Sequence, residues 1–253
     1  MDDASLPFHL TTVKDGPPIA KVNGSKGVGG ATTKLYVADG PGPTSFEASG
    51  LQLVPYTMKG QRVAVYIVGA AGSGKSVWIA NAIKAMPKKQ TLLFTTASEL
   101  DPAFDKDKVV QIDYMADPEI LNTFNIDDLQ DSICIFDDFD NSTNPKINAQ
   151  MQAIIRTVLE NGRKLQIDVF VVSHNPRDYN RTRTLILECS TFVVFPQTNR
   201  AATLRFLKEY FDDDRRFLER VKRISDGGRF TWVALHKSVP RYMVTEKSAT
   251  LLE

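Results

Sequence analysis

The sequence has little cysteine and no long apolar run. Only two of its 253 residues are cysteines, Cys134 and Cys189, and both lie in apolar stretches. This usage argues against a disulfide scaffold and favours a reducing compartment. No apolar run approaches the ~18 residues that a membrane helix needs, and the start Met1-Asp2-Asp3 does not resemble a signal peptide. We therefore expect an intracellular chain without a membrane segment.

The sequence also lacks a strong charge of either sign. It has 31 Lys and Arg against 30 Asp and Glu, a net charge of +1. This balance argues against a protein held on nucleic acid by bulk electrostatics alone. There is no zinc-finger spacing, helix-turn-helix pattern or RNA-recognition signature, so sequence-specific readout is not supported. The composition, 42% hydrophobic and 24% charged, is that of an ordinary globular protein.

What the sequence does contain is a phosphate-binding loop. An apolar run ends in GAAGSGKS at residues 69–76, and a helix-like apolar pattern follows. The glycines allow backbone turns in which successive N–H groups face one phosphate chain. Lys75 can then reach the β- and γ-phosphates of ATP, and the Ser76 hydroxyl can bind Mg²⁺. The residues expected to bind the nucleotide are Gly69, Ala70, Ala71, Gly72, Ser73, Gly74, Lys75, Ser76 and Val77.

A second signal is the apolar strand pattern ICIFDD at residues 133–138. Acidic residues at the end of a buried strand are what a Walker B element requires. We expect Asp137 to order the Mg²⁺ shell together with Ser76, and Asp138 to polarise the attacking water. Such residues also occur simply as solvated loop ends, but that interpretation is weaker downstream of a complete P-loop. Asp140 is interpreted as a surface or capping residue.

From Gln61 onward, strand and helix patterns alternate, which is typical of a parallel sheet flanked by helices. Strands are expected at 63–68, 91–95, 109–112, 132–136, 169–173, 191–195 and 230–235, and helices near 75–86, 148–160 and 201–210. We predict a three-layer α/β P-loop NTPase fold with a mostly parallel central sheet. Its parts would be a β-rich or extended N-terminal arm (1–60), an ATPase domain (61–237) and a C-terminal tail (238–253).

Two polar segments flank the strand expected at 169–173. Before it, a helix pattern ends in Asn161-Gly162-Arg163-Lys164; after it come His174-Asn175-Pro176. Ligands lie at the carboxyl ends of parallel strands, so His174 or Asn175 could sense the γ-phosphate. The alternative is that both residues only open a turn before Pro176.

Together these segments resemble the FtsK–HerA superfamily of DNA-translocating ATPases, and within it the genome-packaging ATPases of large double-stranded DNA viruses. The resemblance covers residues 61–237. It implies that Arg163 is an arginine finger for a neighbouring subunit's nucleotide and that His174 stands where the family usually has Gln. Asp138 stands where cellular members carry Glu, although viral packaging members look similar to this chain. The implied catalytic residues are Lys75, Asp138, Arg163 and His174.

The resemblance implies ATP-driven packaging of a viral genome into a capsid. The implied partners are double-stranded DNA without sequence specificity, further copies in a pentameric or hexameric ring, and a capsid or portal protein. The host cytoplasm or viral factory, or the virion, would be its location. Basic clusters at 177–183 and 215–223 are candidates for DNA contact, although a charge run is usually a solvated helix face. Another P-loop DNA motor, a helicase-like ATPase and a small-molecule kinase remain alternatives.

Overall fold

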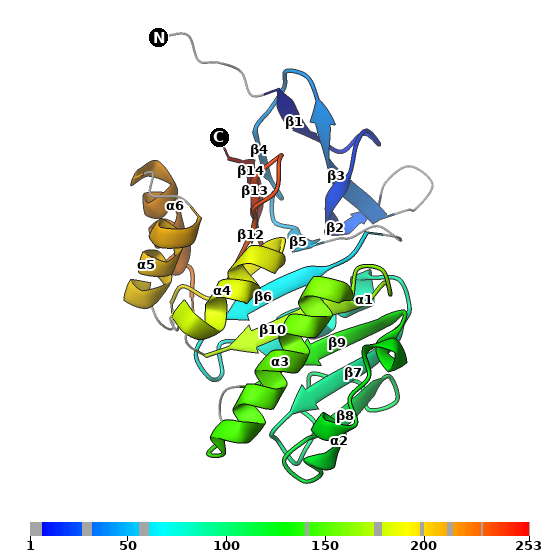
Figure 1. Ribbon diagram of the computed structural model, residues 1–253. Coiled ribbons are helices and arrows are strands. Elements are labelled where there is room, and N and C mark those ends of the chain that lie inside the picture. The colour runs from blue at the N-terminus through cyan, green and yellow to red at the C-terminus, as the bar shows by residue number, and fades with distance from the viewer. Residues whose placement is uncertain are drawn as a thin grey trace.

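A ten-stranded mixed sheet forms the centre of the computed structural model, which describes residues 7–26, 32–55, 61–139, 142–174, 179–197, 200–211, 215–228 and 230–252. Its parallel strands are β6 (Ala64–Val68), β7 (Gln90–Thr95), β8 (Val109–Asp113), β9 (Ser132–Phe136), β10 (Asp168–Ser173) and β11 (Thr191–Val194). Its antiparallel strands are β4 (Ser45–Glu47), β12 (Val233–His236), β13 (Tyr242–Thr245) and β14 (Ser248–Leu251). The order is β4-β14-β13-β12-β11-β6-β10-β9-β7-β8 (Figure 1).

The sheet is buried on both faces, as the continuous apolar strands predict. Along β6, Tyr66 and its alternate neighbours join one apolar cluster, while Ile67 and its alternate neighbours join another. The first cluster is covered by α2 (Glu119–Asn122), α3 (Pro145–Asn161), α4 (Tyr179–Glu188), α5 (Arg200–Tyr210) and α6 (Arg215–Ser225). The second is covered by α1 (Lys75–Ala85) and the N-terminal strands. The predicted three-layer fold is confirmed.

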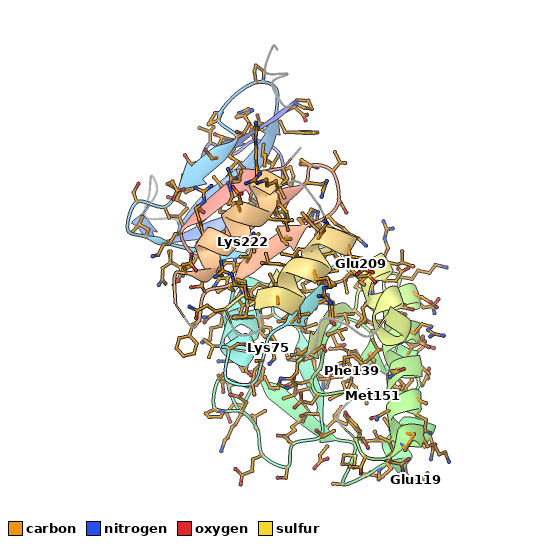
Figure 2. The ribbon with its side chains drawn as sticks, turned by 90° about the vertical axis from the view of Figure 1, so that its left-hand side faces the viewer. Lys75, Glu119, Phe139, Met151, Glu209 and Lys222 are labelled. Atoms are coloured by element: carbon orange, nitrogen blue, oxygen red, sulfur yellow. The ribbon has the colours of Figure 1, made fainter. Side chains whose placement is uncertain are left out.

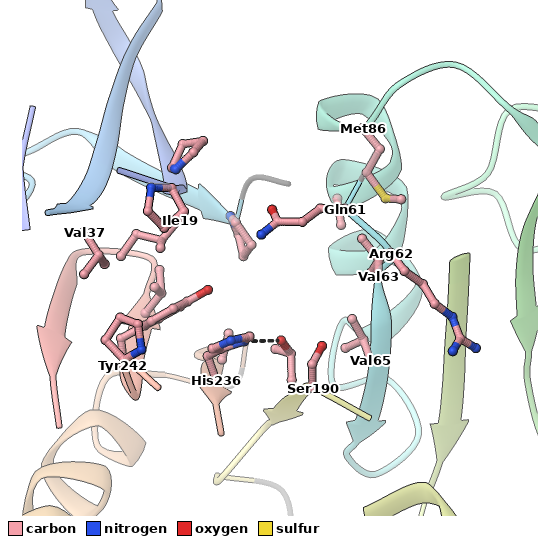
Figure 3. A pocket seen from close by; sticks show the side chains of 18 of the residues that line it. Ile19, Val37, Gln61, Arg62, Val63, Val65, Met86, Ser190, His236 and Tyr242 are labelled. Atoms are coloured by element: carbon pink, nitrogen blue, oxygen red, sulfur yellow. Dashed lines mark hydrogen bonds between the residues drawn. The ribbon is translucent and has the colours of Figure 1, made fainter. Parts of the chain in front are cut away.

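The N-terminal residues form a separate antiparallel sheet of four strands, β1 (Phe8–Thr11), β3 (Thr32–Asp39), β2 (Pro18–Lys26) and β5 (Gln52–Pro55), in that order. Its buried side chains share one apolar cluster with α1. A cavity of about 270 Å³ remains between this sheet, α1 and the central strands. Figure 3 shows Ile19 and Val37 on one side of it and His236 and Tyr242 on another. The segment therefore covers the part of the sheet that α1 leaves open.

The C-terminal residues are not the tail that the sequence predicts. Most of residues 238–253 form β13 and β14, which extend the central sheet, and β14 also pairs with β4 from the N-terminal segment. Met243, Val244 and Ala249 are each about 1% exposed. β13 and β14 have only four residues each, and strands this short carry a weak alternation signal.

The predicted helices near 75–86, 148–160 and 201–210 correspond to α1, α3 and α5, whereas α2, α4 and α6 were not predicted. The expected strand at 230–235 begins only at Val233, which leaves Phe230 in a loop. Among the described residues, no helix is both long and apolar enough to cross a membrane.

Candidate nucleotide site

The P-loop joins the end of β6 to the start of α1. Pairing with β10 and β11 on either side holds β6, and the Gly69 N–H donates to the Ser173 carbonyl at 3.2 Å. A Cβ on Gly69 would lie 2.6 Å from Ser73 Oγ, so this close approach requires glycine. Gly74 has a φ of 100° and is the N-cap of α1. The loop thus aims the amino end of α1 at the carboxyl edge of the sheet.

Lys75 lies across this loop and is only 7% exposed. Its ammonium donates to the carbonyl oxygens of Gly69 at 2.7 Å and Ala70 at 3.2 Å. Its third contact is His174 Nδ1, at 3.3 Å. Burial lowers the pKa of Lys75, and the nearby carboxylates of Asp137 and Asp138 act in the opposite direction.

His174 connects the P-loop lysine to the acidic end of β9. An ammonium can only donate, so Nδ1 of His174 is the acceptor and the ring proton lies on Nε2. His174 Nε2 lies 2.6 Å from Asp138 Oδ1. This contact lowers the pKa of Asp138, while partial burial acts against it. Asp138 has a φ of 53°, a left-handed conformation that Asp tolerates better than most residues.

Asp137 is more buried than Asp138. Its backbone N–H donates to the Phe94 carbonyl at 2.9 Å and so continues the pairing of β9 with β7. Burial, followed by the Asp138 charge, raises the pKa of Asp137 to about 6. A buried carboxylate beside a like charge favours a bound cation, and a carboxylate with a serine hydroxyl is a donor set that Mg²⁺ accepts.

Asp137 and Ser76 could therefore hold Mg²⁺ together with nucleotide phosphates. The described part of the chain has no group of three or more His, Cys, Asp or Glu that could hold a metal ion. Mg²⁺ at phosphate sites usually binds through one or two protein ligands, phosphates and water.

A hollow of about 260 Å³ lies in front of the P-loop. Its lining consists of Gly72, Ser73, Gly74, Lys75, Ser76, Val77, Asp101 and Phe230. The Ser73 hydroxyl is buried without a hydrogen-bond partner among the described residues, so the hollow has an unused donor. Sequence reasoning missed Asp101 and Phe230. Neither belongs to a motif, and the only available signal was an aromatic residue close to the Gly227-Gly228 pair.

The fold brings four predicted residues together and separates a fifth. Lys75, Asp137, Asp138 and His174 interact at the carboxyl edge of the sheet. Arg163 is exposed and lines a different hollow, of about 780 Å³, beside the first residues of β6 and β10. The predicted positions Asn175, Pro176, Arg177 and Asp140 lie outside the described residues.

Comparison with known proteins gives both a sequence relative and structural neighbours. No family model matches the chain. Uncharacterized protein V3 of Sputnik virophage is 30% identical over 251 residues, which cover 96% of this chain and 98% of V3. The cytoplasmic domain of the type VII secretion ATPase EccC from Thermomonospora curvata has a TM-score of 0.52 at 13% identity. That match covers 82% of this chain and 28% of EccC.

The genome packaging NTPase B204 of Sulfolobus turreted icosahedral virus 2 has a TM-score of 0.47 at 16% identity, over 78% of this chain and all of B204. The fold shared with EccC agrees with the predicted P-loop NTPase fold. The match to V3 extends over almost the full length of both chains. The chain belongs to the same family as virophage protein V3.

Proposed function

We propose that this chain hydrolyses ATP with Mg²⁺ and uses the reaction to move double-stranded DNA into a viral capsid. The observation that carries the proposal is the chain of contacts from Lys75 through His174 to Asp138. It connects the ends of three parallel strands at the mouth of the P-loop, where ligands of α/β sheets bind. The P-loop lysine lines the hollow, and His174 connects it to the carboxylate that we propose as the base.

Each residue has a chemical task in this proposal. Lys75 donates to the β- and γ-phosphates. His174 lowers the pKa of Asp138 and so favours its ionised form, and Asp138 orients the attacking water and accepts its proton. His174 lies between the lysine and the carboxylate and contacts both, so its ring positions one relative to the other. Ser76 and Asp137 would hold Mg²⁺, which when bound would neutralise charge on the phosphate oxygens.

A second copy of the chain would complete the site. Arg163 lies near the amino ends of β6 and β10, opposite the P-loop edge. The six residues of β10, at roughly 3.3 Å each, separate the two edges by about 20 Å. Arg163 is thus too far from the P-loop of its own chain to contact nucleotide bound there. It is exposed, so it can contact nucleotide bound by a neighbouring copy. This favours a homo-oligomeric ring, pentameric or hexameric, in which Arg163 acts in trans.

The helix α6 supplies a surface for DNA. Five of its 11 residues are Arg or Lys and one is Glu. Phe217, Val221 and Ser225 are buried, whereas the five basic residues are exposed on the other side. Figures 1 and 2 agree that α5 and α6 lie on the outside of the molecule, and Lys222 is on this outer side. Several such faces around one duplex would hold DNA phosphates without reading sequence.

The viral setting of the proposal is supported by the relative from a virophage. A capsid or portal protein would be the further partner, and the host cytoplasm, viral factory or virion the location.

The test is to measure phosphate release from Mg·ATP with and without double-stranded DNA. We expect duplex DNA to stimulate release, and Lys75→Ala to lower ATP affinity at least about tenfold and to abolish release. Transfer of phosphate to a small acceptor, without stimulation by DNA, would instead identify a kinase. A Lys75→Ala variant that binds and hydrolyses ATP normally would rule out the P-loop assignment.

A further inference from the structure

A second pocket adjoins the P-loop hollow on the side of α1. It has a volume of about 420 Å³, within the ~300–1,000 Å³ usual for small-molecule sites. Its lining consists of Gln52, Leu53, Val54, Pro55, Gly74, Val77, Trp78, Asn81, Phe195, Phe230, Trp232 and Glu246. Three of these residues, Gly74, Val77 and Phe230, also line the P-loop hollow. The two spaces are therefore adjacent, with these three residues between or beside them.

Two exposed apolar side chains line the mouth of this side pocket. Phe230 is 64% exposed and Val77 is 55% exposed, although both are large apolar side chains. A Cβ on Gly74 would lie 3.4 Å from the Phe230 ring, so the ring stands directly beside the loop. Deeper in the pocket, Trp78 and Trp232 meet edge to face with ring centroids 6.0 Å apart. Aromatic walls of this kind favour a planar ring stacked against them.

The pocket also offers polar groups for the edge of such a ring. Glu246 accepts a hydrogen bond from Gln52 Nε2 at 2.7 Å, and its carboxylate keeps further acceptor capacity. The side chain of Asn81, on the exposed side of α1, can both donate and accept. Trp78 Nε1 is a buried donor without a partner among the described residues. Trp78 lines both this pocket and the cavity under the N-terminal sheet, and buried donors usually have partners, so this N–H is a donor that a ligand acceptor could use.

We propose that this side pocket binds the purine ring of the nucleotide whose phosphates occupy the P-loop, an inference that rests on the proposed function. The bicyclic ring stacks on Phe230, its exocyclic group faces Glu246 and Asn81, and Trp78 Nε1 meets a ring nitrogen. Part of the wall is formed by Leu53 and Val54 of β5 and by Glu246, which lies in the turn between β13 and β14. The N-terminal sheet and the end of the chain are thus parts of the nucleotide site.

Two residues that line the pocket flank the helices α5 and α6 in the sequence. Phe195 immediately precedes the segment that contains α5 and α6, and Phe230 follows it. Both aromatic rings approach P-loop glycines: Phe195 lies against Gly69, and Phe230 against Gly74. A base stacked on Phe230 therefore contacts the polypeptide that carries the proposed DNA-binding face.

The experiment compares ATP with tripolyphosphate, which has the phosphates without the base, in calorimetric titrations of the full chain with Mg²⁺. Wild type should bind ATP more tightly than tripolyphosphate, and ATP and GTP more tightly than CTP and UTP. Phe230→Ala should weaken ATP binding at least about fivefold, the scale of base–aromatic stacking, and leave tripolyphosphate binding within about twofold. Phe230→Tyr should retain ATP affinity because the ring remains.

An optical measurement accompanies the titrations. The chain has two tryptophans, and both line this pocket, so ATP should change the intrinsic fluorescence while tripolyphosphate should not. Val13→Ala, a truncation of an exposed apolar side chain (72% exposed) in the N-terminal segment, is the matched control and should behave as wild type.

The outcomes separate this inference from the proposed function. If Phe230→Ala weakens ATP and tripolyphosphate equally, or neither, the base does not lie on Phe230 and the inference is wrong. If tripolyphosphate and ATP bind the wild type equally well, the P-loop assignment survives and the purine pocket does not. If neither binds, the proposed function fails and the pocket assignment fails with it.

Discussion

At the scale of single residues, the two carboxylates after β9 have different surroundings. Asp138 contacts His174 and has a lowered pKa, whereas Asp137 is more buried and has a raised pKa. We expect Asp138→Asn to bind ATP and Mg²⁺ almost normally and to hydrolyse ATP about 10²-fold more slowly, the usual cost of losing a positioned base. Asp137→Asn should instead raise the Mg²⁺ concentration needed for half-maximal rate. Single-turnover rates and magnesium titrations measure the two effects separately.

The control for this prediction is Asp140→Asn, which removes the neighbouring acidic charge. It should retain normal turnover. Normal hydrolysis by Asp138→Asn together with a defect in Asp140→Asn would mean that the catalytic carboxylate is a different one.

A second residue-scale prediction concerns His236, whose ring lies against Tyr242 with centroids 4.7 Å apart and contacts Thr191 Oγ1 at 3.2 Å. Burial, with a smaller contribution from Lys237, lowers the pKa of His236 from 6.5 to about 4. The unfolded chain therefore binds a proton at higher pH than the folded chain does. The free energy of unfolding should fall as pH decreases from about 6.5 to about 4, by roughly 3 kcal/mol at most.

The measurement is urea unfolding at several pH values, with His236→Gln as the comparison because glutamine has no titration in this range. The difference between wild type and variant isolates His236 from Asp137, whose raised pKa changes stability with pH in the opposite direction. Parallel pH profiles for the two proteins would show that His236 titrates normally in the folded state.

At the scale of elements, α6 separates its packing face from its charged face. Phe217 and Val221 are buried, while Arg220 and Lys222 are exposed, so changing the latter two should not disturb folding. We expect Arg220→Glu with Lys222→Glu to weaken duplex binding at least about tenfold. The slope of log affinity against log salt should also become shallower by about 2, one unit for each lost phosphate contact.

The matched control for α6 reverses two exposed charges elsewhere, Lys14→Glu with Lys106→Glu, and keeps the same change in net charge. It should bind duplex like wild type. Equal losses in both double variants would mean that net charge, and not the face of α6, governs binding.

At the scale of the whole molecule, the prediction is that hydrolysis needs two copies of the chain. Arg163→Ala should bind ATP normally and hydrolyse it about 10³-fold more slowly, because a positive group supplied in trans neutralises charge in the transition state. Mixing Arg163→Ala with Lys75→Ala should restore part of the activity, since an intact P-loop of one can meet an intact Arg163 of the other. Phosphate release after subunit exchange measures this recovery.

Lys164→Ala is the control, because Lys164 is adjacent, exposed and lines the same hollow. It should be nearly as active as wild type. A fully active Arg163→Ala, or mixtures without recovery, would mean that Arg163 is an ordinary surface residue at a helix end, whose charge contributes less than about 1 kcal/mol there.

The sequence by itself determined the parts of the site that lie within one short segment. The glycine spacing of residues 69–76 and the apolar run before Asp137 are local patterns, and β9 spans the predicted 132–136. Each such pattern works because backbone conformation and burial depend on neighbouring residues. The role of Arg163 as an arginine finger remains a prediction from the family resemblance.

Only the tertiary structure decided what lies next to these segments. His174 contacts a lysine 99 positions earlier in the chain, and β14 pairs with a strand from the N-terminal segment. Phe230, predicted within a strand, lies in a loop beside Gly74. These contacts arise from sheet order and from burying both faces of the sheet, and they join residues that share no local pattern. The sequence could therefore indicate a nucleotide site. Which distant residues lie beside that site depends on the strand order and on the segments that pack over the two faces of the sheet.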